Sequence, residues 1–394
     1  LTLVTDELKR VYAEYGQDAV VCNGWRWAPG SAMFPVIGGA VYNTECESFG
    51  CWAFQTEALG MYSHGDHPDL MMAPDKYDLP NADTIVLYGC NPAWSQHSSM
   101  YWLKNAQKAG VKFVFVGPDY NATAAAMDAR WIRVRPGTDT KLLLSWFRYI
   151  FENKLYDEEF TKYWTNLPFL IDPDTKLPVR AQELFPDFQQ TTPENTPAYV
   201  CFDLKTNAVA PFEYSAPADS AVDPEIFWAG EFNGKQYKTA GQIYKEEADP
   251  WTLEKTAEEC WLQADKIEEA IKLYVENNGG IANGVASDMT ESASQVPLGC
   301  MGLDSIMGRI NKPGVTMTQK GGGYFATMTD TGETKLVRPV TYNNGFGGMF
   351  SDMYGVGAVI GMSDAENEAR IKQLGEAMPD SQRILNKLLQ DRLG

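Results

Sequence analysis

Hydrophobic residues in the first half of the chain fall in short runs separated by amphipathic stretches. DAVVCNG, TIVLYGC (residues 84–90) and KFVFVGP (residues 112–118) are typical of strands. SSMYWLKNAQKAG has helical periodicity and ends on Gly110, and WIRVRPG (residues 131–137) precedes the amphipathic helix TKLLLSWFRYIFENK. This recurrence of strand, helix and strand predicts a parallel, doubly wound α/β sheet.

The second half has a less regular pattern. From about Asn166 to Pro250 the chain is rich in proline, aromatic and acidic residues without a sustained period, which predicts an irregular excursion. One long helix is predicted over LEKTAEECWLQADKIEEAIKLYVENNGG, closed by Gly279. GIANGVAS then predicts a strand and LGCMGLDSIMGRI a helix, the start of a second α/β segment. Residues 314–361 are rich in Gly and Met and predict loops, followed by two surface helices.

Composition excludes several classes of partner. The 33 Lys and Arg against 52 Asp and Glu give a net charge of -19, which repels phosphate backbones and excludes nucleic acid. No apolar run approaches the ~20 residues that span a bilayer, so direct membrane insertion is not expected. The opening LTLVTDELKRVYAEYG lacks a signal-peptide pattern and places Leu3, Leu8 and Val11 on one helical face, so we expect further residues upstream.

A polar turn follows the first central strand, at the edge where open α/β sheets bind ligands. In Tyr88-Gly89-Cys90-Asn91-Pro92, glycine permits close backbone approach and the Asn91 amide can both donate and accept hydrogen bonds. An ordinary strand-to-helix turn would have the same composition.

Two further turns follow the next strands. Gly117-Pro118-Asp119, which continues to Thr123, places an acid where dinucleotide folds contact a ribose or base. In Arg135-Pro136-Gly137-Thr138-Asp139, the carboxylate of Asp139 can accept two hydrogen bonds from a guanine edge or simply cap the following helix. None of the turns contains GxGxxG, which disfavours an ordinary nicotinamide or flavin site.

Taken together, the turns resemble those of the pterin-dependent dimethyl sulfoxide reductase family, which includes formate dehydrogenases and acetylene hydratase. That family has a GxNP turn, a PD…T.TA..AD segment and a PGTD turn, and this chain has YGCNPAW, GPDYNATAAAMD and RPGTD. LEKTAEECWLQADKIEEAIKLY is similar to the family stretch tpE…tgv.adkI.eaArlya, and GCMGLDSIMGRINKPG to l..LtGNigkPGG. The departures are Gly117 for a frequent Asp, Asp119 for a frequent Arg, and Arg309-Ile310-Asn311 for Asn-Ile-Gly.

The resemblance implies a bis(molybdopterin guanine dinucleotide) cofactor carrying molybdenum or tungsten. Its implied binding residues are Gly89, Asn91, Pro92, Pro118, Asp119, Thr123, Gly137, Thr138, Asp139 and Gly284. Cys51 aligns with the residue that binds the metal in the family, and a thiolate suits such a metal. Cys46 is a rival ligand, and a buried structural thiol is the alternative for Cys51. His64 is a candidate general acid near the substrate, or else a polar surface residue.

The resemblance also implies two doubly wound, Rossmann-like lobes, each binding one guanine dinucleotide. We expect an inserted lobe at residues 46–274 and a discontinuous lobe at residues 1–45 and 275–394. A [4Fe-4S] module and a C-terminal cap are expected outside these residues, so the chain alone should be inactive. The implied partners are a small-molecule substrate and an electron-transfer subunit, either an Fe–S protein or a membrane anchor. We favour a prokaryotic, extracytoplasmic membrane-associated complex of anaerobic respiration.

Three classes of function fit the resemblance. The first is a redox catalytic subunit, either reductase or dehydroxylase, that transfers an oxo, hydroxyl or hydride group with two electrons. The second is a non-redox hydratase or transhydroxylase. The third is a cofactor-free structural relative, against which the retention of three cofactor-lining turns and Cys51 argues.

Overall fold

The computed structural model describes residues 1–16, 19–23, 40–42, 77–95, 97–192, 196–284 and 295–316. The chain divides into two compact units, Leu1–Asp66 with Gln319–Gly394, and His67–Thr318. These units have other bounds than the predicted lobes of residues 46–274 and of residues 1–45 with 275–394, and the lobe boundaries stay a prediction. How the two units share a cofactor stays a prediction. None of the helices in the described ranges is long and apolar enough to cross a membrane.

The first unit contains the predicted N-terminal helix and the strand in DAVVCNG. Helix α1 spans Thr2–Tyr15, and strand β1 (Val21–Asn23) pairs in parallel with β2 (Ala40–Tyr42).

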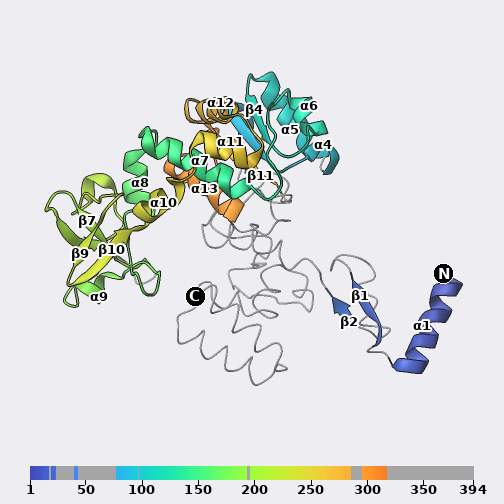
Figure 1. Cartoon of the computed structure of the whole chain (residues 1–394), viewed down its shortest axis with the longest axis horizontal. Coiled ribbons are helices and arrows are strands. Elements are labelled where there is room, and N and C mark those ends of the chain that lie inside the picture. The colour runs from blue at the N-terminus through green and yellow to red at the C-terminus, as the bar shows by residue number, and fades with distance from the viewer. Residues whose placement is uncertain are drawn as a thin grey trace, which may run out of the picture. The chain divides into compact units, whose positions relative to one another are not determined.

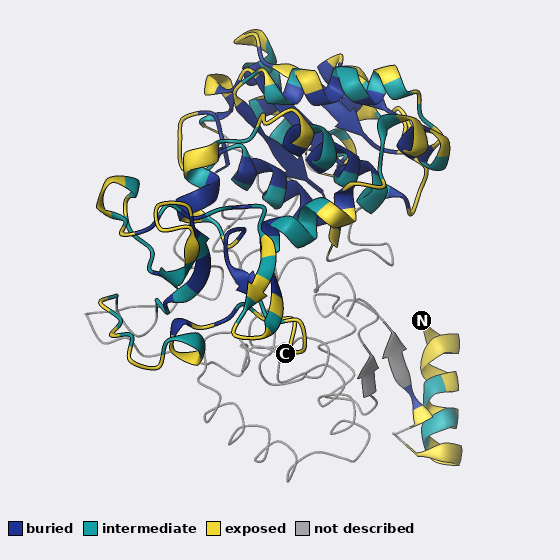
Figure 2. Cartoon of the chain, turned by 60° about the vertical axis from the view of Figure 1, so that its left-hand side comes forward, coloured by how far each residue is buried: buried dark blue, intermediate teal, exposed yellow. Residues whose placement is uncertain are grey.

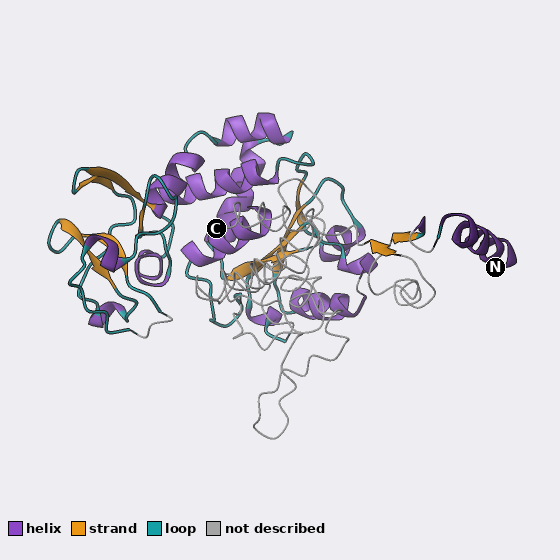
Figure 3. Cartoon of the chain, turned by 90° about the horizontal axis from the view of Figure 1, so that it is seen from below, coloured by secondary structure: helices purple, strands orange, loops and turns teal. Residues whose placement is uncertain are grey.

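The second unit is built on a four-stranded parallel sheet in the order β11-β3-β4-β5. Figure 3 shows strands in orange with helices in purple packed around them. The strands of this sheet are β3 (Thr84–Tyr88), β4 (Lys112–Val116), β5 (Arg130–Ile132) and β11 (Gly279–Asn283). Connecting and covering them are η4 (Leu79–Asn81), α4 (Pro92–Ser95), α5 (His97–Lys108), α6 (Ala122–Met127), α7 (Asp139–Glu152), α11 (Leu253–Cys260), α12 (Ala264–Val275) and α13 (Gln295–Ile306). The predicted α/β fold is confirmed.

Helices cover both faces of this sheet because alternate strand residues point to opposite sides. Ile85 and Phe115 belong to one core cluster with Leu103 of α5 and Met127 of α6. On the opposite face, α12 contacts β3 and β5, and α13 contacts α7 and β11. In Figure 2 the strands are buried, shown in dark blue, beneath helices whose outer turns are exposed.

The prediction of an irregular excursion at residues 166–250 is wrong. The segment forms a three-stranded antiparallel sheet, β6-β10-β9, and a two-stranded one, β7-β8. Helix α8 (Glu158–Trp164) precedes the segment. The elements of the segment are β6 (Leu170–Ile171), α9 (Ala181–Leu184), β7 (Tyr199–Asp203), β8 (Ala208–Phe212), η5 (Pro217–Asp219), β9 (Ala229–Phe232), β10 (Lys235–Thr239) and α10 (Ala240–Ala248). In Figure 1 most of these strands gather at the end of the unit opposite α4, α5 and α6. Strands of two to five residues are too short to show a period in the sequence.

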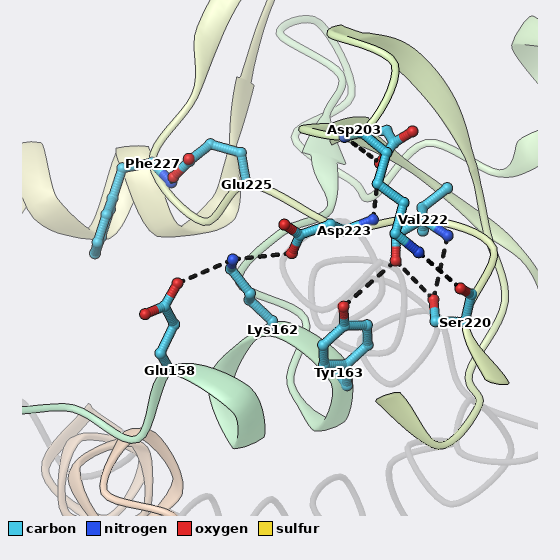
Figure 4. A network of polar contacts seen from close by, with 10 residues as sticks. Glu158, Lys162, Tyr163, Asp203, Ser220, Val222, Asp223, Glu225 and Phe227 are labelled. Carbon is cyan, nitrogen blue, oxygen red and sulfur yellow. Dashed lines mark hydrogen bonds and ion pairs between the residues drawn. The ribbon is translucent and has the colours of Figure 1, made fainter. Parts of the chain in front are cut away.

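A polar network joins this antiparallel segment to α8 (Figure 4). Lys162 lies between Glu158 and Asp223, with its Nζ 2.9 Å from a carboxylate oxygen of each. The buried Asp203 accepts a 2.7 Å hydrogen bond from the backbone N–H of Asp223. Because Asp203 also accepts from the Thr206 hydroxyl, its carboxylate organises the turn between β7 and β8. This network is structural, and it is separate from the turns considered above.

The single helix predicted from Leu253 onward is instead two helices. Helix α11 ends at Cys260, Trp261 adopts a left-handed conformation with φ 58 and ψ 39, and α12 begins at Ala264. Gly279 does not close this helix but begins β11, where an added Cβ would lie 1.6 Å from the Thr84 carbonyl oxygen.

A buried carboxylate fastens α13 to β11. Oδ2 of Asp304 accepts from the Ile281 N–H at 3.1 Å and from the Thr316 hydroxyl at 2.6 Å, and Oδ1 accepts from the Tyr274 hydroxyl at 2.7 Å. Arg309 donates to the carbonyls of Tyr274 and Asn277, just past the last turn of α12. The departure from the family at position 309 thus supplies a cap for this helix end.

Candidate functional site

The order of the sheet reverses between β3 and β11. From β3 the chain continues to β4 and β5 on one side, and β11 then pairs with the other side of β3. Such a reversal opens a crevice at the carboxyl ends of the two strands, where ligands of α/β proteins bind. Gly89 follows β3 and Gly284 follows β11, so two of the predicted cofactor residues lie at this crevice.

Glycine is required at the floor of the crevice. A Cβ on Gly284 would lie 2.3 Å from the Cβ of Cys90 and 2.6 Å from the carbonyl oxygen of Gly89. The N–H of Gly284 donates to the Tyr88 carbonyl at 2.8 Å, and Gly89 has a positive φ of 60°. The two chain segments therefore approach at a distance that no other residue type permits.

The first and second turns are joined through Asn91 and Thr123. The buried Thr123 hydroxyl accepts from the N–H of Ala93 at 2.9 Å and donates to Oδ1 of Asn91 at 2.8 Å. Because Oδ1 faces Thr123, the amide nitrogen of Asn91 is the end directed elsewhere. Asn121 adds a second link, since its Nδ2 donates to the Cys90 carbonyl while its Oδ1 caps α6.

The second turn presents Pro118 and Asp119 to solvent, and Pro92 is buried at the start of α4. The side chain of Trp131 fixes this turn by donating to the Gly117 carbonyl at 2.9 Å. A Cβ on Gly117 would lie 2.8 Å from the Phe115 ring, so a side chain at this position would require the ring to shift.

The third turn delivers Asp139 to the start of α7. Gly137 has a φ of 78° with no neighbour within 4 Å of an added Cβ, and the Thr138 hydroxyl donates to the Arg135 carbonyl at 2.7 Å. Thr138 is the N-cap residue, so capping by Asp139 is wrong; Asp139 lies in the first helical turn. Its Oδ1 instead accepts from the Tyr88 hydroxyl at 3.0 Å.

Burial determines the electrostatics of this pair. It raises the pKa of Asp139 above the ordinary value, and the hydrogen bond from Tyr88 opposes that rise. Burial, followed by the nearby Asp139 charge, raises the pKa of Tyr88 well above its usual value. Tyr88 is therefore a protonated donor at neutral pH, and Asp139 is a half-buried acceptor.

Tyr88 and Asn121 were not assigned a role from the sequence. The apolar run TIVLYGC predicts a buried strand but does not indicate that Tyr88 faces α7. Asn121 precedes ATAAAM, and an Asn before a helical run is an N-cap signal that was available. Cys51 and His64 lie outside the described residues, as do Cys46 and the rest of their segment. Within the described ranges, no group of three His, Cys, Asp or Glu side chains is arranged to hold a metal.

The arrangement fits a nucleotide with a polar base edge. Gly89 leaves its backbone without a side chain, and the Asp139 carboxylate can accept hydrogen bonds from ligand N–H groups beside the one that it accepts from Tyr88. In the comparison with known proteins, a family model described as molybdopterin oxidoreductase matches residues 1–365. The chain belongs to the molybdopterin oxidoreductase family.

Relatives place the chain in the dimethyl sulfoxide reductase family, as the motifs predict. It is 31% identical over 208 residues to a dimethyl sulfoxide reductase catalytic subunit of Halobacterium salinarum, covering 52% of this chain and 23% of that protein. It is 34% identical over 140 residues to the alpha chain of perchlorate reductase from Dechloromonas aromatica, covering 32% and 15%. This molybdopterin oxidoreductase chain thus spans a quarter or less of these relatives.

Among solved structures, acetylene hydratase from Pelobacter acetylenicus matches 78% of this chain and 32% of its own, with 16% identity and a TM-score of 0.39.

Proposed function

We propose that this chain is the cofactor-binding part of the catalytic subunit of a molybdenum or tungsten enzyme with bis(molybdopterin guanine dinucleotide). The reaction is a two-electron transfer of an oxo, hydroxyl or hydride group to or from a small substrate, with a reductase or dehydroxylase favoured. The observation that supports this most is the hydrogen bond from Tyr88 to Asp139, which joins the third turn to the carboxyl end of β3, beside which β11 pairs.

Different residues of the chain would bind different parts of the cofactor. Asp139 would accept hydrogen bonds from the N1–H and amino group of guanine, and the amide nitrogen of Asn91 would donate to an acceptor. Gly89, with its positive φ, would let the ligand approach the backbone at the end of β3, and Gly284 lets the two chain segments pack against each other there. The bound group would supply reversible two-electron chemistry at its metal. We also propose Cys51 as the metal ligand.

The remaining parts of the proposal concern the whole protein. His64 is proposed as a general acid near the substrate. A [4Fe-4S] cluster beyond these residues and an electron-transfer subunit would carry electrons, in an extracytoplasmic membrane-associated complex.

The test is metal and pterin analysis of the whole protein purified without oxygen, with viologen-linked assays of candidate acceptors. Asp139→Asn should lower the pterin content, since a hydrogen bond to a charged group contributes about 1.5–3 kcal/mol. Asp219→Asn, at an exposed position in η5, is the matched control. Absence of both metal and pterin would support the cofactor-free alternative. A loaded protein whose products involve no net electron transfer would support the hydratase or transhydroxylase alternative.

A further inference from the structure

Trp261 occupies a backbone conformation that disfavours bulky side chains. It is the only aromatic residue with positive φ among the described non-glycine residues, and Gly or Asn is usual at such a helix end. Its side chain is also 69% exposed, so burial does not compensate for the strain. A strained, exposed tryptophan points to a role in binding rather than in folding.

Arg135 holds the Trp261 ring from one side. The guanidinium carbon lies 4.8 Å from the centre of the indole, within the range of a cation–π interaction. The backbone supports this pairing, because the Arg135 N–H donates to the Cys260 carbonyl at 3.0 Å. With Arg135 on one face of the ring, the exposed remainder is available to a second planar group.

The pair stands next to the turn that carries Asp139. The Arg135 carbonyl accepts from the hydroxyl of Thr138, and the Cys260 thiol donates to the Thr138 carbonyl across 3.6 Å. Trp261 directly follows Cys260, and Asp139 directly follows Thr138, so the contact between Cys260 and Thr138 brings Trp261 and Asp139 near each other. A base whose edge contacts Asp139 therefore lies close to the indole of Trp261.

Three cationic side chains, Arg135, Lys141 and Lys255, lie around α11, which itself carries Glu254, Glu258 and Glu259. Lys141 pairs with Glu259 at 2.6 Å, and both Lys141 and Lys255 lie over the Trp251 ring, at 5.3 and 4.5 Å. Lys141, and then Lys255 and Arg135, lower the pKa of Glu259, so three cations surround one carboxylate. An exposed indole such as Trp261, with cationic side chains nearby, suits a ligand that is both planar and anionic.

We propose that Trp261 and Arg135 form a stacking wall for the guanine base of the nucleotide, with the base packed on the exposed face of the indole. The inference rests on the proposed function, in which Asp139 contacts the edge of the same base. Stacking fixes the plane of the base, and the carboxylate then selects guanine by its N1–H and amino group.

The experiment measures GMP binding to the full chain by equilibrium dialysis, and the chemical shift of the base H8 proton by NMR. Trp261→Gly should weaken GMP binding roughly fivefold or more and abolish the upfield ring-current shift of H8. The same variant should unfold at a higher urea concentration, because glycine adopts positive φ without strain. Trp261→Phe should keep most of the binding and shift. Trp164→Ala, which removes another half-exposed indole, should leave GMP binding unchanged.

Two results would overturn the inference: GMP binding by Trp261→Gly equal to that of the unsubstituted chain, or no GMP binding by the unsubstituted chain. Pterin content of the whole enzyme separates this failure from that of the proposed function. If the whole enzyme contains pterin and either of these results is found, the proposed function stands and the stacking wall is rejected. A whole enzyme without pterin rejects the proposed function itself.

Discussion

The hydroxyl of Tyr88 donates a hydrogen bond to Oδ1 of Asp139 across 3.0 Å, although 51 positions separate the two residues. The backbone carbonyl of Tyr88 meanwhile accepts from the N–H of Gly284 at 2.8 Å. One residue at the end of β3 thus links β11 to the carboxylate at the start of α7. This link predicts that Tyr88 positions Asp139 without touching the ligand.

In the Tyr88→Phe variant, the pH below which GMP affinity is lost should be higher than in the unsubstituted chain. The hydrogen bond from Tyr88 lowers the pKa of Asp139 against the larger effect of burial, so its loss raises that pKa further. Because the guanine edge needs an ionised acceptor, binding is then lost at a higher pH than in the unsubstituted chain. GMP affinity measured between pH 4 and 8 checks this. Tyr101→Phe, at an exposed tyrosine of α5, should leave the profile in place, and coincident profiles for all three chains would contradict the positioning role.

Thr123→Val should weaken both the fold and cofactor retention. The substitution leaves the N–H of Ala93 without its acceptor and releases Oδ1 of Asn91. The expected loss in the free energy of unfolding is about 1–3 kcal/mol, the usual cost of an unsatisfied buried group. Urea denaturation and pterin content of the whole enzyme provide the measurements. Thr123→Ser keeps the hydroxyl and should remain close to the unsubstituted protein; equal losses in the two variants would show that the methyl group matters instead.

Asp304 should make the second unit less stable as the pH rises from about 4 to 7. Burial raises the pKa of this carboxyl from 3.8 to about 6. The folded state therefore holds a proton that the unfolded state has released, so stability is greatest below pH 4 and is lost as the pH passes 6. A difference of about two pKa units corresponds to about 3 kcal/mol.

Asp304→Asn removes this titration while its amide can still donate to the Tyr274 oxygen. The free energy of unfolding of the variant, relative to the unsubstituted chain, should increase by about 3 kcal/mol between pH 4 and 7. Urea denaturation across that range tests the prediction, with Asp219→Asn expected to run parallel to the unsubstituted chain. Parallel curves for Asp304→Asn as well would mean that Asp304 does not titrate there.

Pattern alone predicts the parallel sheet and the turns that carry Asn91, Thr123 and Asp139, because buried strands and their carboxyl-end turns have local signals. The Tyr88–Asp139 contact has no such signal: an unbroken apolar strand does not say which of its residues faces which helix. The helix break at Trp261 was missed for a related reason. A tryptophan is not a helix-ending residue, and only the contacts of the folded chain hold it in the left-handed region.

The pairing of β11 with β3 has a consequence for how the protein is made. The N–H of Asn278 bonds to Asp83 across 195 positions, so the ribosome finishes β3 long before its neighbour exists. Until then one apolar edge of β3 is unpaired and prone to associate with other chains. Chains cut short before residue 283 should therefore aggregate. The contact between Gly89 and Gly284 is complete only when this last strand has docked, so the proposed nucleotide would load after synthesis of the unit rather than during it.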